Sequence, residues 1–361
     1  MGISKTGLIT VVIPNYNGLQ YIEDCIDSLL AGSFVPEIIV VDNHSSDGSC
    51  ERVREKYPQV LLYRLEANTG FCHAVNCGLH LTKTPYVILL NNDTKADPRF
   101  VEELYTAIVQ NQRAFSAQAK MLSMKDPEVI DDAGDLYCAL GWAFARGKAK
   151  SRDCYHTAGE IFSACAGAAI YRMSVFDRIG LFDERHYCYL EDVDIGYRAA
   201  IYGYRNLYAP KAIVYHAGSA SSGSVHNPFK ESMASGNNAY LLYKNMPAFQ
   251  YALNAPLIGL GRLIKQVYFQ RKGLGEAYMQ GLRRGKYLKE MAKERDLFLS
   301  AGLPYRKDSI CEEAAIEGSE ELDQILPLYL GGKVPFAFSN LPNYLHIQGQ
   351  LWMNCARRLK G

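Results

Sequence analysis

The sequence has no long hydrophobic run and no large excess of charge of either sign. No stretch reaches the roughly 20 uninterrupted apolar residues that a membrane-spanning helix needs, because residues 251–270 are interrupted by Arg262 and Lys265. The formal net charge is +1, so no overall field favours nucleic acid. The N-terminus lacks the features of a signal peptide, since its apolar segment is short and meets Pro14. We therefore expect a cytoplasmic protein that does not bind nucleic acid.

The cysteines show no metal-binding pattern. The chain contains 10 cysteines, but none form a CxxC pair or a Cys/His cluster with the spacing of zinc ligands. Free, buried thiols in a reducing compartment are the expected state.

Apolar segments that alternate with helical patterns predict an α/β fold with a mostly parallel central sheet. The expected strands cover residues 8–13, 37–41, 60–64 and 85–90, and the helices between them cover residues 19–30, 50–56 and 73–80. Asp42 and Asp93 each follow a strand. Ligands bind at the carboxyl ends of strands in such sheets, so both carboxylates are expected at that crevice.

The following part of the chain is less regular. Residues 114–159 predict only short strands and loops over the crevice. A strand at 164–171, a short helix at 175–179, a helix at 190–202 closed by Gly203, and a last strand at 212–216 follow. We therefore expect a nucleotide- and acceptor-binding catalytic domain over residues 1–225.

Residues 226–361 are predicted to form a mainly helical C-terminal extension with segregated charge. Residues 262–295 carry ten bases and three acids, whereas residues 308–323 carry seven acids and no base. Such runs usually form solvated faces. The alternative is a basic surface on anionic lipid, so we expect this region to contact a membrane or to form a homo-oligomer.

Two residues at strand ends are candidate metal ligands. Asp93 offers the oxygen that Mg²⁺ and Mn²⁺ prefer, and His216 offers a neutral imidazole. The structural alternatives are an Asx turn at Asp93 and a hydrogen-bonded, half-buried histidine at His216.

The acidic run from Glu191 to Asp194 begins a helix, where carboxylates also serve as caps. Glu191, Asp194 and Arg198 share one face, while Asp192 points elsewhere and is free to act as a general base. Cleavage of a sugar nucleotide needs a divalent cation for the departing diphosphate and one such base for the acceptor hydroxyl.

Seven motifs in this order resemble the family 2 glycosyltransferases of GT-A fold, particularly the rhamnosyltransferase and galactofuranosyltransferase branch. The motifs begin at Val11, Ile39, Asn68, Leu89, Gly180, Glu191 and His216, and they include VVIPNYN, IVVDNHSSDG, LLNND, EDVD and HAGS. The resemblance covers roughly residues 8–225.

The resemblance implies roles for individual residues. Asp192 is the expected catalytic base, and Asp93 and His216 are the expected ligands of Mg²⁺ or Mn²⁺. A second group is expected to bind the nucleotide: Pro14, Asn15, Tyr16, Asp42, Asn68 and Asn92. A third group is expected to support the site or shape the acceptor pocket: Glu191, Asp194, Asp183 and Glu184.

The resemblance further implies an inverting, metal-dependent transfer in bacterial cell-surface polysaccharide synthesis. The first expected donor is dTDP-rhamnose, and the acceptor is a glycan or a lipid-linked glycan. The motif Asp-x-Asp of many relatives has Asn91 at its first position here, which leaves one sure carboxylate. The alternative function is a non-catalytic protein that binds sugar nucleotides.

Overall fold

The computed structural model describes residues 7–218, 226–300 and 331–359, the side chains of 297–300 excepted. A mixed sheet forms the centre, with strand order β10-β12-β6-β11-β4-β1-β2-β3, while β5 pairs with β12 and β7 with β6. Its strands are β1 Ile9–Asn15, β2 Glu37–Asp42, β3 Leu61–Arg64, β4 Tyr86–Leu90, β5 Thr94–Ala96, β6 Ala114–Ser123, β7 Ile130–Asp132, β10 Gly159–Ile161, β11 Ala168–Arg172 and β12 Arg205–His216. A separate hairpin joins β8 Asp135–Cys138 and β9 Trp142–Ala145.

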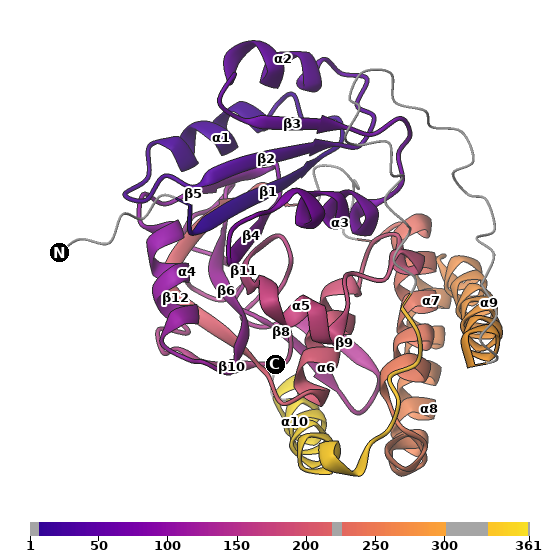
Figure 1. The fold of residues 1–361 in the computed structure, drawn as a ribbon. Coiled ribbons are helices and arrows are strands. Elements are labelled where there is room, and N and C mark those ends of the chain that lie inside the picture. The colour runs from indigo at the N-terminus through magenta and orange to yellow at the C-terminus, as the bar shows by residue number, and fades with distance from the viewer. Residues whose placement is uncertain (1–6, 219–225, 301–330, 360–361) are drawn as a thin grey trace.

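The predicted α/β class is confirmed. Strands β3, β2, β1 and β4 are parallel, as are β6 and β12, and β11 joins these two parts in antiparallel pairing. Helices α1 Ile22–Leu30, α2 Ser49–Lys56 and α4 Phe100–Val109 cover one face. Helices α3 Phe71–Leu81, α5 Met173–Ile179 and α6 Glu191–Ile201 cover the other (Figure 1). Because both faces are covered, the parallel strands are continuously apolar.

The prediction of short strands and loops over 114–159 was wrong for the first residues of this range, which form a long strand. Strand β6 has 10 residues and lies inside the sheet. Its polar side chains Ser116, Gln118 and Lys120 are all buried. Ser116 donates a hydrogen bond to Asn206, Gln118 accepts one from the Cys165 amide, and Lys120 donates to backbone carbonyls. Buried, hydrogen-bonded polar side chains of this kind hide a strand from a hydrophobic pattern.

Two further boundaries differ from the predictions. Strand β11 begins at Ala168, after a turn at residues 166–167, and β12 begins seven residues earlier than predicted, at Arg205. The helix predicted at 190–202 is α6, and Gly203 follows its C-cap with φ of 85°. This left-handed conformation is the reason for glycine at that position.

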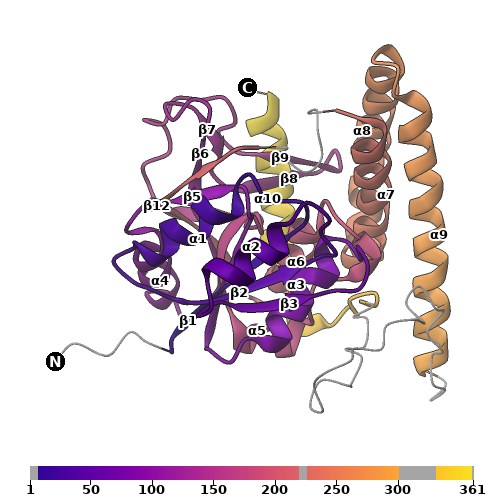
Figure 2. The same cartoon turned by 90° about the horizontal axis from the view of Figure 1, so that it is seen from above.

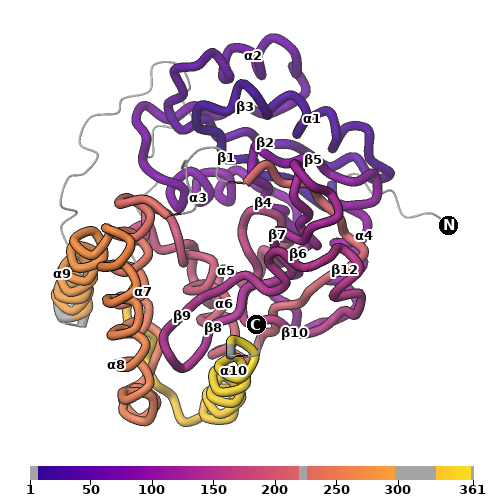
Figure 3. The backbone as a smooth tube through the Cα atoms, turned by 180° about the vertical axis from the view of Figure 1, so that it is seen from behind, coloured from indigo at the N-terminus to yellow at the C-terminus, as the bar shows by residue number. Residues whose placement is uncertain are grey.

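The C-terminal extension is helical, as predicted, with α7 Pro228–Asn245, α8 Ala248–Arg271, α9 Gly275–Ser300 and α10 Leu341–Leu359. Figure 2 shows α7, α8 and α9 beside the sheet domain, and Figure 3 shows α8 near β9 and α10 near β8. Helices α7 and α9 cross closely, since a Cβ on Gly285 would lie 2.6 Å from the Gly236 carbonyl. Helices α7 and α10 share a hydrophobic core with α6. The expected division at residue 225 falls at the gap before residue 226. The described residues do not include the acidic segment 308–323 or Ser219.

Candidate active site

The crevice lies where β1 and β4 end, because the chain leaves β1 toward β2 on one side and returns to β4 on the other. The Asn92 side chain donates to Asn15 Oδ1 at 2.7 Å, and Asn15 Nδ2 donates to Asp42 Oδ1 at 2.9 Å. The Ser45 amide donates to the other Asp42 oxygen at 3.0 Å. The structure thus brings three predicted nucleotide-binding residues together as a buried network that fixes the loops.

The other predicted nucleotide-binding residues are more accessible. Pro14 is partly buried, whereas Tyr16 and Asn68 are exposed. Asn68 Oδ1 accepts hydrogen bonds from Asn43 Nδ2 at 3.0 Å and from the Tyr187 hydroxyl at 3.2 Å. Sequence reasoning missed Asn43 and Tyr187, which hold the Asn68 side chain at the entrance.

The two predicted metal ligands lie together. The edge pairing of β5 with β12 places His216 opposite Thr94, so His216 Nε2 is 3.2 Å from Asp93 Oδ1. Its Nδ1 is 2.8 Å from Asp131 Oδ2, and Asp131 also pairs with Lys148. Burial lowers the pKa of His216, but the hydrogen bonds to Asp131 and Asp93 outweigh burial and raise it to about 9.

These residues fit a divalent cation. A carboxylate oxygen and an imidazole nitrogen converge, and the far nitrogen of the imidazole is held by a second carboxylate, as in many metal sites. Burial raises the pKa of Asp131, yet His216 and Lys148 outweigh it and lower it to about 2. Asp131 and Lys148 were missed, although three acids within residues 131–135 were a visible signal.

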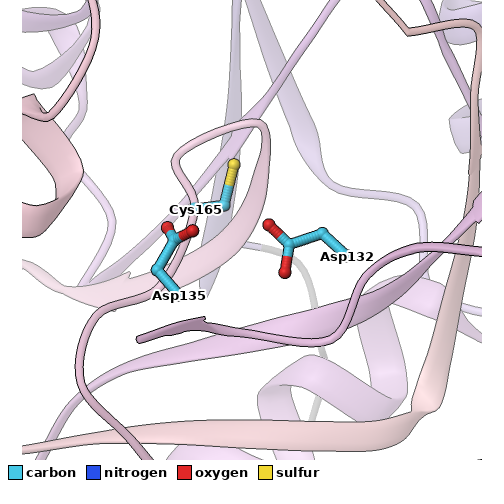
Figure 4. Close-up of side chains that lie close together, drawn as sticks. All are labelled: Asp132, Asp135 and Cys165. Atoms are coloured by element: carbon cyan, nitrogen blue, oxygen red, sulfur yellow. The ribbon is translucent and has the colours of Figure 1, made fainter. Parts of the chain in front are cut away.

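A second carboxyl cluster lies on the other side of β7. Successive strand residues point to opposite faces, so Asp131 meets His216 while Asp132 meets Asp135 and Cys165 (Figure 4). The ligand atoms of these three lie within 4.8 Å of one another. Burial raises the pKa of Asp132 to about 7 and that of the Cys165 thiol well above its usual value. A neutral thiol is a poor ligand for Mg²⁺, so the Asp93–His216 pair suits the cation better.

Asp192 adjoins this second cluster at the start of α6. Its carboxylate accepts from the Val193 amide at 2.7 Å and is hydrogen-bonded to Asp135. Burial and the charge of Asp192 raise the pKa of Asp135 well above its usual range, while burial raises that of Asp192. We infer that Asp135 holds the proton and donates to an ionised Asp192. A base with a raised pKa accepts a proton more readily near neutral pH.

The residues predicted to support the site or shape the acceptor pocket are buried. Asp183 and Asp194 have no exposed surface. Glu184 contacts His73 at 2.9 Å and Asn76 at 2.8 Å, and burial raises the pKa of Glu191 well above its usual range. In this conformation Glu184 binds α3 and Asp194 holds α6 in place, and an acceptor does not reach Asp183 or Asp194.

Helix α7 supplies the partners of these buried acids. Lys244 Nζ lies 2.7 Å from Asp183 and 2.9 Å from Asp194, and Asn245 Nδ2 donates to Asp194 at 2.7 Å. On α6, Arg198 pairs with Asp194 at 3.0 Å. Sequence reasoning missed Lys244 and Asn245, because nothing in the α7 pattern distinguishes them from surface residues.

Helix α7 also holds the turn before α6. Tyr187, Tyr189 and Leu190 all have φ between 62° and 71°, a left-handed conformation that is strained for such side chains. The Asn237 side chain donates to three carbonyls of this turn, at 2.8 to 2.9 Å. Arg284 of α9 then donates to Asn237 Oδ1 at 2.6 Å. The C-terminal helices therefore fix the turn that places Asp192.

Comparisons with known proteins agree with this fold. The structure is similar to that of GalNAc-T7 with UDP, GalNAc and Mn²⁺, with a TM-score of 0.55 and 14% identity over 84% of this chain and 59% of the other. It is also similar to the mannosyltransferase PcManGT of Pyrobaculum calidifontis in complex with GDP-Man and Mn²⁺, with a TM-score of 0.50 and 16% identity over 81% and 79%. The fold is thus of the GT-A type.

The model of glycosyl transferase family 2 matches residues 10–180, which is just under half of the chain. The N-acetylglucosaminyl-diphospho-decaprenol L-rhamnosyltransferase of Mycobacterium tuberculosis is 27% identical over 245 residues, 60% of this chain and 78% of the relative. These two matches support a family 2 glycosyltransferase that is similar to the rhamnosyltransferase-like branch.

Proposed function

We propose that the enzyme is an inverting, metal-dependent transferase that moves L-rhamnose from dTDP-rhamnose to an acceptor hydroxyl in bacterial cell-surface polysaccharide synthesis. The observation that carries this proposal is the arrangement around β7. Asp131 meets the Asp93–His216 pair on one side of the strand, and Asp132 adjoins the Asp135–Asp192 pair on the other. Inverting displacement needs the leaving group and the base on opposite faces of the sugar. The Asp93–His216 pair and Asp192, on opposite sides of one short strand, suit this requirement.

In this proposal Asp93 and His216 hold a divalent cation, Mg²⁺ or Mn²⁺. The cation supplies charge stabilisation for the departing diphosphate. Asp192 takes the proton of the acceptor hydroxyl, and the new bond forms on the face opposite the leaving group, which inverts the anomeric configuration. Asp135 keeps Asp192 oriented and ionised through its hydrogen bond. Tyr16 and Asn68 contact the nucleotide at the entrance of the crevice.

The acceptor in this proposal is a lipid-linked glycan, as the name of the mycobacterial relative suggests for that relative. We propose that the enzyme works at the inner face of the cytoplasmic membrane. None of the helices that the structure describes is both long and apolar enough to span a bilayer. Peripheral contact would then bring the crevice to such an acceptor. Homo-oligomerisation through residues 226–361 remains a further proposal.

A thermal-shift screen tests the donor. We expect dTDP-rhamnose with Mn²⁺ to raise the melting temperature more than UDP-galactofuranose, other UDP-hexoses or GDP-mannose at equal concentration. A ligand present at 100 times its Kd stabilises the folded state by about 2.7 kcal/mol. A larger shift with a UDP-sugar would contradict dTDP-rhamnose as the donor but would leave the proposed reaction class in place. The absence of a shift with any sugar nucleotide would contradict the proposed function.

The His216→Ala variant tests the cation site. We expect at least about a tenfold weaker apparent affinity for Mn²⁺, because the variant loses one of two convergent ligands and the group that orients Asp131. The measurement is a Mn²⁺ titration of nucleotide binding by calorimetry. His226→Ala is the matched control, because His226 also contacts a carboxylate, Glu231 at 2.7 Å, but at the start of α7. An unchanged titration in His216→Ala would remove this residue from the ligand set.

A further inference from the structure

Helix α8 carries an apolar face that belongs to none of the hydrophobic cores formed by the described residues. Five large apolar side chains recur at spacings of four and three residues and are 37% to 53% exposed: Leu253, Leu257, Leu260, Ile264 and Val267. This spacing puts them on one side of the helix. Phe249 extends the row toward the N-terminus, and Leu263, which is 57% exposed, flanks it. The row spans about 27 Å at the rise of an α-helix.

A different side of α8 faces the protein. Asn254, Ile258 and Gly261 are buried. A Cβ on Gly261 would lie 2.1 Å from the Leu140 carbonyl, and the Trp142 indole donates to the Gly261 carbonyl at 3.1 Å. Helix α8 is therefore seated against the β8–β9 hairpin, and the apolar row points outward.

Aromatic side chains continue the row at its N-terminal end. The Phe249 and Phe336 ring centroids lie 5.6 Å apart, and those of Phe336 and Phe338 lie 5.3 Å apart. Phe338 is 83% exposed. From α10, the half-exposed Trp352 donates to Asn254 of α8 at 3.1 Å. The exposed face is thus a surface built by three segments.

The charge around this face selects its partner. Helix α8 contains no acidic residue. Arg271 follows Val267 by four residues on the same side, and the neighbouring Lys272 is also exposed. Arg283 and Lys286 of α9 are exposed as well. An apolar stripe bordered by aromatic rings and cations, on a helix without acids, matches the interface of an anionic bilayer.

We propose that this apolar face, formed by α8 with Phe336, Phe338 and Trp352, docks the enzyme on the surface of an anionic membrane. The choice of a bilayer over a second copy of the chain rests on the proposed function, because a polyprenyl-linked acceptor is itself held in a membrane. The apolar side chains enter the headgroup region, and Arg271 and Lys272 contact lipid phosphates. The sheet domain stays in water above the lipid.

Vesicle flotation of the full chain tests this docking face. We expect binding to vesicles of phosphatidylcholine mixed with phosphatidylglycerol, weaker binding to phosphatidylcholine alone, and a decrease with added salt. The triple variant Leu260→Gln, Ile264→Gln, Val267→Gln should bind roughly 100-fold more weakly, because three apolar side chains no longer enter the lipid. The variant Arg271→Gln, Lys272→Gln should lose the preference for anionic lipid, but it should still bind vesicles through its apolar side chains.

The matched control is the double variant Val35→Gln, Leu61→Gln, which removes similarly exposed apolar side chains from the loop before β2 and from β3. Figure 1 shows β2 and β3 away from α8, so this variant should bind as the wild type does. Wild-type binding by the triple variant would overturn the proposal. So would a wild-type dimer that the triple variant dissociates, seen by light scattering, without vesicle binding. Thermal shift with sugar nucleotides separates the two proposals. If the protein floats with vesicles but binds no sugar nucleotide, the proposed function alone is rejected. If it binds a sugar nucleotide but does not float with vesicles, the docking face alone is rejected.

Discussion

The Asp192→Asn variant is expected to lose about 10²- to 10⁴-fold in transfer rate, the range that a general base contributes. The amide has nearly the shape of the carboxylate but does not accept a proton from the acceptor hydroxyl. Because Asp192 lies beside the Asp135–Cys165 cluster rather than at the Asp93–His216 pair, the Kd of the sugar nucleotide should stay within about twofold of the wild type. Initial rates of transfer and calorimetric binding of the donor measure the two quantities.

Asp135→Asn is the matched control, since it changes the neighbouring carboxyl in the same way. Asp135 is the protonated member of the pair in our account. An amide at this position still donates a hydrogen bond to Asp192, so the variant should retain most of its activity. Full activity in Asp192→Asn would place the base elsewhere, and loss of activity in Asp135→Asn alone would exchange the roles of the two residues.

The comparison of these two aspartates shows what the sequence could and could not predict. Asp192 was predictable because it lies in a short motif at the start of a helix, where the spacing separates it from Asp194 and Arg198. Asp135 has no such context. It reaches Asp192 only because the β8–β9 hairpin folds back toward α6, and that contact spans more than fifty residues of sequence. Local patterns carry no information about such a pairing.

The parallel half of the sheet was predictable for a similar reason. Its strands are continuously apolar, and each ends in a cluster of turn-forming residues. Strand β6 was hidden, because Gln118 and Lys120 are buried polar residues whose partners, the Cys165 amide and the carbonyls of Arg152 and Cys154, lie far along the chain. Hydrogen bonds between residues far apart in the sequence therefore stabilise the strand that the hydrophobic pattern missed.

The predicted supporting roles of Asp183 and Asp194 depend on a partner that the sequence did not reveal. Both carboxylates have no exposed surface and share Lys244 Nζ, which is 1% exposed. Burial alone would raise the pKa of Asp194, but Lys244 and Arg198 lower it well below its usual range, and Lys244 lowers that of Asp183 in the same way. The ion cluster joins α7, the helix that precedes the proposed docking helix α8, to the helix of the proposed base.

The Lys244→Met variant is therefore expected to lose about 3–5 kcal/mol of unfolding free energy at neutral pH, the cost of leaving buried charges without their partner. Urea unfolding followed by circular dichroism measures this loss. Lys56→Met is the matched control, because Lys56 Nζ also lies 2.7 Å and 3.0 Å from two carboxylates, Glu23 and Asp27, but on the exposed surface. Its urea midpoint should not change measurably, since exposed ion pairs contribute little.

The pH dependence separates the ion cluster from a packing defect in Lys244→Met. In the wild type the folded pKa values of Asp183 and Asp194 are lowered, so their contribution is fully present above the unfolded value of about 3.9 and is lost as pH falls through the folded values. In the variant these carboxyls are no longer held ionised by Lys244. The difference in unfolding free energy between the two proteins should accordingly be largest near pH 7 and shrink below about pH 4. A difference that stays constant over this range would assign the loss to packing of the lysine stem, and α7 would then support α6 by shape instead of by charge.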